Sequence, residues 1–141
     1  MTINRIHHLG LTVTDVDASA RWYAAVLDFH RVGDYASPDG TRRKVFMRHD
    51  GFAVRLGLCQ HAATGPDRFE ETRAGLDHVA FAVDDADELR AWESRLHGHD
   101  VHYTSATPAN TLEGALVVVF RDPDNIQLEL IADGADGGVS G

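Results

Sequence analysis

Hydrophobic residues alternate with small or polar residues in two short segments of the chain, residues 8–13 and 78–83. A period of two predicts a β-strand with one buried face. After each segment, apolar residues recur every three or four positions, which predicts an amphipathic helix. The first helix runs to about Leu27. Aspartates stand where the helices begin, Asp15 or Asp17 in the first half and Asp84 or Asp85 in the second, and aspartate is a favoured N-cap.

Three β-rich runs follow each predicted helix. They cover residues 30–35, 44–48 and 52–59 in the first half and residues 101–104, 115–121 and 126–131 in the second. Turn-forming sequences separate most of them, as in Asp-Pro-Asp-Asn at 122–125. Residues 105–114 are small and polar and predict a long loop, a candidate lid. Both halves therefore have the order β-α-β-β-β.

The two halves are an internal repeat. One constant offset places His8 on His78, Val13 on Val83, Asp15 on Asp85 and Trp22 on Trp92. We predict an α+β fold with two tandem modules, about 3–61 and 76–132, joined by a connection at 62–75 and followed by a flexible tail at 133–141. A module of this length forms a poor core alone, so the modules are expected to pack as a single domain over residues 1–132.

Composition excludes several classes of protein. The chain of 141 residues has 13 Lys and Arg against 22 Asp and Glu, a net charge of −9, which disfavours nucleic-acid binding. No apolar run is long enough for a membrane span, and no secretory signal is visible. The single cysteine, Cys59, excludes an intramolecular disulfide and fits a reducing compartment. These features predict a soluble cytoplasmic protein.

The alternation also assigns the faces of the strands. His8 and His78 lie opposite the large apolar residues, and in the last strand Glu129 lies opposite Ile126, Leu128 and Leu130. Two imidazoles and a carboxylate on corresponding faces form a candidate metal site for Fe²⁺, Mn²⁺, Ni²⁺, Co²⁺ or Zn²⁺. In the alternative interpretation, the histidines make ordinary hydrogen bonds and Glu129 pairs with Arg55.

The repeated segments and the closing sequence 120–130, Phe-Arg-Asp-Pro-Asp-Asn-Ile-Gln-Leu-Glu-Leu, resemble the vicinal oxygen chelate superfamily. This group contains glyoxalases, extradiol dioxygenases, methylmalonyl-CoA epimerases and bleomycin- or fosfomycin-resistance proteins. The resemblance implies two βαβββ modules forming a curled mixed sheet around a cleft, in a homodimer. It also implies that the metal ligands are His8, His78 and Glu129.

The chain departs from parts of the family pattern. Glyoxalase I and the epimerases have a fourth ligand, Glu or Gln, at a position that matches Gly57 or Arg55 here. The tyrosine typical of the dioxygenases is replaced by Val119. Neither activity is therefore fully matched.

Two functions from different classes follow. The first is a metal-dependent enzyme of glyoxalase or dioxygenase type, a lyase, isomerase or oxidoreductase, whose small substrate chelates the ion through vicinal oxygens. The alternative is a metal-free protein that binds an antibiotic or metabolite in the same cleft and confers resistance. Candidate substrate-binding residues are Arg55, Cys59, Tyr103 and Asn110.

Overall fold

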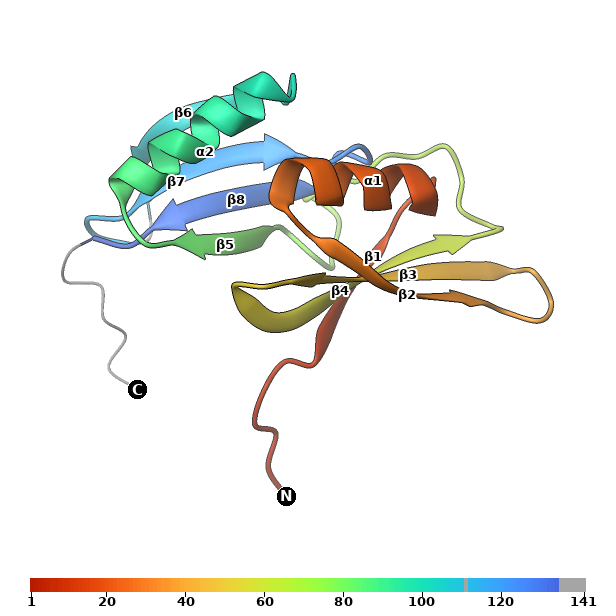
Figure 1. Cartoon of the computed structure of the whole chain (residues 1–141). Helices are drawn as coiled ribbons and strands as arrows, with labels where there is room; N and C mark the ends of the chain where they lie inside the picture. Colours follow the sequence, from red (N-terminus) through yellow and green to blue (C-terminus); the bar gives the residue numbers. More distant parts are fainter. Residues whose placement is uncertain (111, 135–141) are drawn as a thin grey trace. The chain divides into compact units, whose positions relative to one another are not determined.

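The computed structural model describes residues 1–110 and 112–134, which fall into two compact units (Figure 1). The first unit ends at Asp67 and the second begins at Arg68. Most of the predicted flexible tail, residues 135–141, lies outside the described residues. Each unit has one helix and one four-stranded sheet, so the predicted α+β class and the β-α-β-β-β order are confirmed.

The two units have the same topology. Their elements are β1 (His8–Thr12), α1 (Val16–Leu27), β2 (His30–Ala36), β3 (Arg42–His49) and β4 (Phe52–His61) in the first unit, and β5 (Val79–Val83), α2 (Ala86–Gly98), β6 (Tyr103–Pro108), β7 (Leu116–Arg121) and β8 (Gln127–Ala132) in the second. The sheet orders are β1-β4-β3-β2 and β5-β8-β7-β6. The first strand of each unit pairs parallel with the last, and the other pairs are antiparallel. The described residues thus form two four-stranded mixed sheets, neither of which is closed.

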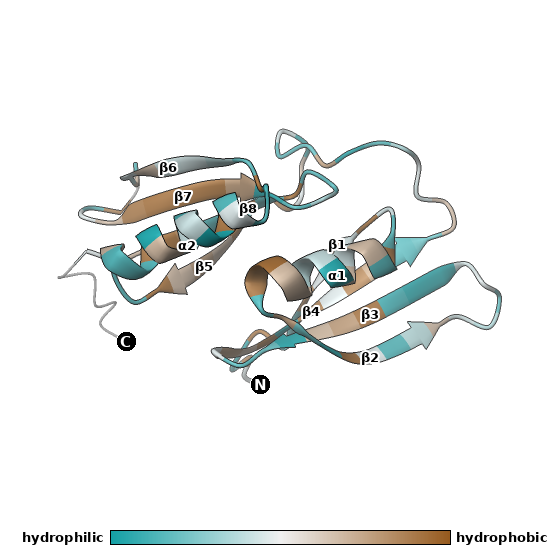
Figure 2. Cartoon of the chain, turned by 45° about the horizontal axis from the view of Figure 1, so that its top comes forward, coloured by the Kyte–Doolittle hydropathy of each residue, from teal (hydrophilic) through white to brown (hydrophobic). Residues whose placement is uncertain are grey.

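Alternating side chains bury one face of each sheet. The buried strand residues on this face include Leu11, Val45, Met47, Leu56 and Leu58 in the first unit and Val79, Val118, Phe120, Leu128, Leu130 and Ala132 in the second. They share the core of their unit with helix residues such as Tyr23 and Leu89, both fully buried. Along most of its length β7 is hydrophobic, whereas β3 changes from hydrophilic to hydrophobic (Figure 2). Opposite the core, each sheet has a face that points away from the helix of its unit, which we call the helix-free face.

Both helices begin at the aspartates expected from the repeat. The carboxylate of Asp15 accepts hydrogen bonds from the N–H groups of Asp17 (3.0 Å) and Ala18 (2.9 Å). In the second unit, Asp85 accepts from Asp87 (2.9 Å) and Glu88 (2.8 Å) in the same way. The alternative N-caps, Asp17 and Asp84, do not cap the helices.

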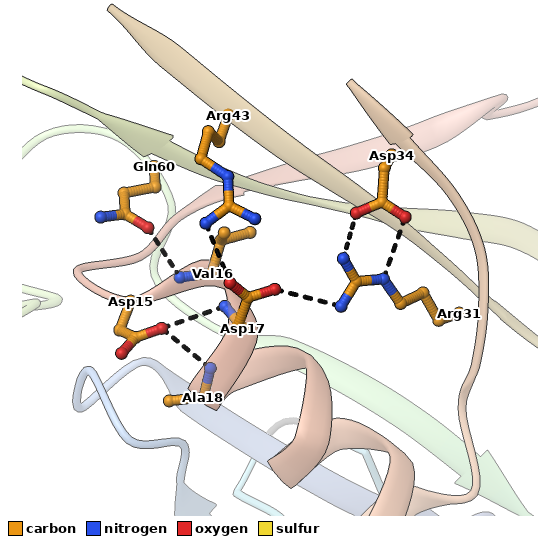
Figure 3. A network of polar contacts seen from close by, with 8 residues as sticks. All are labelled: Asp15, Val16, Asp17, Ala18, Arg31, Asp34, Arg43 and Gln60. Carbon is orange, nitrogen blue, oxygen red and sulfur yellow. Dashed lines mark hydrogen bonds and ion pairs between the residues drawn. The ribbon is translucent and has the colours of Figure 1, made fainter. Parts of the chain in front are cut away.

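Asp17 instead connects the start of α1 to the sheet (Figure 3). Its carboxylate accepts from Arg31 in β2 (3.1 Å) and from Arg43 in β3 (2.9 Å). The hydrogen bonds from Arg43 and Arg31 lower the pKa of Asp17 below its usual value. Beside it, the side chain of Gln60 in β4 accepts from the N–H of Val16 (3.0 Å), so three strands hold the first turn of this helix.

The predicted boundaries were wrong in the region of β6. Residues 101–104 were expected to form the strand, but β6 begins at Tyr103 and continues to Pro108, inside the expected loop at 105–114. A register shift between Thr104 and Thr107 interrupts the pairing with β7, and proline at the end of an edge strand loses no required hydrogen bond. The sequence pattern missed this strand because small polar residues fill an irregular edge.

The connection at 62–75 is also more ordered than a plain linker. The N–H of Phe69 donates to the carbonyl of Asp124 (3.0 Å), and the side-chain amide of Asn125 donates to the carbonyl of Phe69 (2.9 Å). The later part of the connection therefore belongs to the second unit. In the described residues, no helix combines the length and the apolar character needed to cross a bilayer.

The two N-caps give the first prediction. Asp85→Ala should lower the free energy of unfolding by about 1 kcal/mol, because two helix N–H groups lose their acceptor. Asp15→Ala should have a similar effect. Chemical denaturation followed by circular dichroism measures both changes. Asp85→Asn is the control and should remain close to the wild type, since asparagine also caps helices. An equal loss in the Ala and Asn variants would contradict the capping role.

Candidate metal centre

The helix-free face of the second unit carries His78 and Glu129. His78 directly precedes β5, and Glu129 in β8 lies opposite Ala80 in the parallel pair. Nε2 of His78 and Oε2 of Glu129 are 3.6 Å apart. The Glu129 side chain is 16% exposed and that of His78 is 40% exposed. Parallel pairing thus brings together two polar side chains from the two ends of the module.

A hydrogen bond orients the imidazole of His78. Its Nδ1 lies 2.6 Å from a carboxylate oxygen of Asp77. An ionised carboxylate can only accept, so Nδ1 carries the hydrogen and, in the neutral ring, Nε2 has a free lone pair. That lone pair and the Glu129 oxygen then face each other as two acceptors. Positive charge is needed between them, either a proton on Nε2 or a cation.

The geometry of this pair fits a metal ion. Donors that each lie about 2.1 Å from a shared ion can be at most about 4.2 Å apart, and an arrangement in which a carboxylate holds a ligating histidine is common in metal sites. Two donors are too few for a tight site. Among the described residues, no group of three or more His, Cys, Asp or Glu side chains is placed to hold a metal. A metal bound by His78 and Glu129 therefore needs at least one further ligand.

His8 occupies the repeat position of His78 in the first unit. It begins β1 and is exposed, opposite Arg55 in the parallel pair with β4. Its Nδ1 lies 2.9 Å from Nδ1 of His7, and its Nε2 makes no hydrogen bond in the described part of the chain. Its position on the helix-free face agrees with the predicted alternation.

The strand register explains why the first unit lacks a carboxylate like that of Glu129. Gly10 pairs with Gly57 in the first unit, and Ala80 pairs with Glu129 in the second, so Gly57 occupies the repeat position of Glu129. The ring of Phe46 lies 3.7 Å from where a Cβ of Gly57 would be. Gly57, one of the two positions that match the family's fourth ligand, therefore has no side chain, and the ring of Phe46 would be in van der Waals contact with a Cβ there.

The first unit also presents positive charge on its helix-free face. The register places Arg42, Lys44 and Arg55 on this face. In the described ranges 1–110 and 112–134, no carboxylate lies within ion-pair distance of these three cations. Arg42 lies over the ring of Tyr35 (5.6 Å to its centroid), and its buried Nε has no hydrogen-bond partner in the same ranges. Arg55 is exposed beside His8, and in the second unit Glu129 contacts Gln127 and His78.

The other sequence candidates are more scattered. Cys59 is buried on the helix-free face of the first unit, where its thiol lies 3.6 Å from the carbonyl of Gly57. Tyr103 pairs with Phe120, so it lies on the helix side of its sheet and does not share a face with Glu129. Asn110 is exposed between β6 and β7. The structure thus brings Cys59 near Lys44 in the register and places Tyr103 on the opposite face of the sheet from Glu129.

Three polar residues next to this pair were not among the sequence candidates. Gln127 donates to Glu129 (3.1 Å), and Arg121 donates to Gln127 (2.9 Å). Arg121 also makes a bidentate pair with Glu71 (2.8 and 2.9 Å), which lowers the pKa of Glu71 to about 2. Strand alternation was a usable signal for Gln127, which shares the face of Glu129. Glu71 had no such signal, because it lies in an irregular segment.

Comparisons with known proteins agree with this architecture. The sequence model of the Glyoxalase/Bleomycin resistance protein/Dioxygenase superfamily matches residues 5–130. The uncharacterized protein YqjT of Bacillus subtilis is 26% identical over 132 residues, covering 90% of this chain and 98% of YqjT. The uncharacterized protein YaeR of Escherichia coli is 26% identical over 129 residues, 91% of this chain and 95% of YaeR.

Two solved structures are similar as well. The glyoxylase/bleomycin resistance protein/dioxygenase domain from Frankia sp. EAN1pec has a TM-score of 0.83 and 32% identity, covering 94% of this chain and 99% of that one. A variant of the fosfomycin resistance protein FosX from Listeria monocytogenes, complexed with Mn(II) and 1S,2S-dihydroxypropylphosphonic acid, has a TM-score of 0.71 and 18% identity, covering 95% and 96%. At that identity, the FosX structure shows a shared fold only.

The ion pair between Glu71 and Arg121 gives a prediction about pH. The pKa of Glu71 in the folded protein, about 2, is below its ordinary value of 4.5, so the pair stabilises the fold above about pH 4.5 and loses this effect as the pH falls toward 2. Glu71→Gln should therefore reduce stability at neutral pH and flatten its dependence on pH between about 4.5 and 2. Urea unfolding at several pH values measures this. Glu70→Gln, which removes a neighbouring exposed carboxylate, is the control. Identical pH dependence in Glu71→Gln and the wild type would contradict the effect.

Proposed function

The chain belongs to the Glyoxalase/Bleomycin resistance protein/Dioxygenase superfamily, and from that premise we propose that it is a metal-dependent enzyme. Its substrate is a small molecule that binds the ion through vicinal oxygens, and the reaction is of glyoxalase or dioxygenase type. The ligands are His78 and Glu129 of the second unit together with His8. The protein acts in the cytoplasm as a homodimer, as the resemblance and the single cysteine suggest.

The observation that carries this proposal is the orientation of two acceptors toward each other. The Asp77 carboxylate holds the hydrogen of His78 on Nδ1, while Nε2 lies 3.6 Å from Oε2 of Glu129. A divalent cation satisfies both atoms, and the matching repeat position makes His8 the natural third ligand. FosX, which has the same fold, binds Mn(II), and this supports a divalent ion here.

A bound Fe²⁺, Mn²⁺, Ni²⁺, Co²⁺ or Zn²⁺ would polarise the vicinal oxygens of the substrate and stabilise negative charge that develops next to them. Two residues of the chain prepare the site for such an ion. Asp77 holds the Nδ1–H side of the His78 ring, so that in the neutral ring the lone pair is on Nε2. Gly57, at the repeat position of Glu129, contributes no side chain, so the chain has no fourth ligand of the kind found in glyoxalase I.

We further propose that the substrate is anionic. Arg55, Lys44 and Arg42 share one face, and no carboxylate of the described residues pairs with any of them. Unpaired cations on the surface of a protein with net charge −9 are well suited to bind a carboxylate, phosphate or phosphonate. Arg55 is the primary candidate because it lies opposite His8 in the register. Lys44 lies on the same face, opposite the buried Cys59 in the register.

Removal of one ligand tests the metal site. His78→Ala should abolish the binding of Mn²⁺ or Co²⁺ while changing the free energy of unfolding by less than about 1 kcal/mol, because this side chain is partly exposed. Isothermal titration calorimetry and elemental analysis measure metal binding. His102→Ala, an exposed histidine outside the proposed site, is the control.

Unchanged affinity in His78→Ala would reject the site. Metal occupancy far below one ion per wild-type chain, after refolding with each of the five ions, would instead favour the metal-free binding protein as the function.

A second variant tests the anionic substrate. Oxalate, a dianion with vicinal oxygens, serves as the probe of the metal-loaded protein. Arg55→Met should weaken oxalate binding about 10- to 100-fold, the usual range for loss of a charge-assisted hydrogen bond, and should leave metal affinity unchanged. Arg48→Met, which removes an arginine already paired with Asp50, should bind oxalate like the wild type. Equal oxalate affinity in Arg55→Met and the wild type would refute the role of Arg55.

A further inference from the structure

We propose that Gln127 is a positioning residue that holds Glu129 in one orientation, with Oε1 occupied by the protein and Oε2 left to bind the cation. The inference rests on the proposed metal site and adds to it a relay of three residues: Gln127, Arg121 and Glu71. The relay lies entirely within the second unit.

The direction of the relay follows from hydrogen-bond chemistry. An arginine can only donate, so the oxygen of the Gln127 side chain must face Nη2 of Arg121, which is 2.9 Å away. The NH₂ group of Gln127 must then point in the other direction. It lies 3.1 Å from Oε1 of Glu129 and donates to it. The hydrogen bond from Arg121 therefore turns the NH₂ group of Gln127 toward Glu129 and the oxygen of Gln127 toward Arg121.

Arg121 is anchored independently of the metal site. It makes two hydrogen bonds with the carboxylate of Glu71 and a third with the backbone carbonyl of Asn125 (3.1 Å). The Arg121 and Glu71 side chains are only 33% and 34% exposed. The paired charges raise the pKa of Arg121 and lower that of Glu71, so both remain charged across the neutral range. Glu71, in the connection between the modules, thus holds Arg121 in place.

The relay restricts the orientation of the Glu129 carboxylate. A glutamate side chain has several rotatable bonds, and a metal ligand must be held close to its working geometry to bind well. With Oε1 accepting from Gln127, Oε2 is the oxygen directed toward Nε2 of His78, at 3.6 Å. The relay therefore favours binding through one oxygen, and it leaves more coordination positions for the substrate.

The repeat shows that this relay is not a requirement of the fold. Ala80 pairs with Glu129 and Gly10 pairs with Gly57, so Gln127, two residues before Glu129, corresponds to Arg55, two residues before Gly57. The first unit forms the same sheet without the amide and without the carboxylate. The amide of Gln127 occurs only in the second unit, where it positions the carboxylate of Glu129.

The test is the binding of Co²⁺ to the whole chain, because the visible absorption of this ion depends on its coordination geometry. Gln127→Met keeps the size of the side chain but can neither donate nor accept. We expect its affinity for Co²⁺ to fall about 10- to 100-fold, as for other groups that orient metal ligands. The absorption spectrum should change as well, since Glu129 is free to bind through both oxygens. The thermal unfolding of the metal-free protein should be little affected.

Gln60→Met is the matched control. Gln60 is also partly buried and hydrogen-bonded in the last strand of its module, where it accepts from Val16. This variant should lose stability and keep the affinity and spectrum of the wild type. A second variant, Gln127→Glu, can still accept from Arg121 but cannot donate to Glu129, and it should show the altered spectrum.

The outcomes separate the two proposals. If Gln127→Met and Gln127→Glu bind Co²⁺ with the affinity and spectrum of the wild type, the positioning role is wrong and the metal site stands. If the wild type itself does not bind Co²⁺, Mn²⁺, Fe²⁺, Ni²⁺ or Zn²⁺, the proposed function is wrong and the positioning role fails with it.

Discussion

The parallel pairing of the first and last strands in each unit is the constraint on which the rest of the molecule depends. In the second unit, this pairing places Ala80 of β5 opposite Glu129 of β8 and brings His78, one residue before β5, to within 3.6 Å of that carboxylate. The register is held by Leu128 and Leu130, which are buried in the core of the unit. A slip by one residue would turn Glu129 toward the core and expose these leucines, at a large cost in free energy. The packing of the hydrophobic face therefore fixes the position of the polar one.

The two units use the same backbone for different chemistry. Their sheet orders and helix caps agree, because capping and core packing depend on positions that the repeat preserves. The residues on the helix-free faces take no part in helix capping or core packing, and they differ between the two units. The second unit has Glu129 and Gln127, where the first has Gly57 and Arg55, together with further cations. One unit thus presents a carboxylate with its supporting hydrogen bonds, and the other presents positive charge around a position without a side chain.

Two carboxylates in this protein stabilise the structure through ion pairs with arginines. Asp17 ties the start of α1 to two strands through Arg31 and Arg43, and Glu71 holds Arg121 at the end of the relay to Glu129. Both carboxylates have lowered pKa values because they accept hydrogen bonds from arginine. The cations of the first helix-free face differ from these, because no carboxylate of the described residues pairs with them.

The sequence by itself determined most of the local structure: the strands with period two, both helices, two candidate caps for each helix, and the face on which His8, His78 and Glu129 lie. Each of these follows from side-chain periodicity or from contacts between near neighbours, which a linear pattern records. The sequence did not determine that β6 continues to Pro108, that Tyr103 lies on the helix side, or that Glu71 meets Arg121. Those features depend on a register shift and on contacts between residues far apart in the chain. Only tertiary packing decides them, because the geometry of such pairs exists only once the sheet has formed.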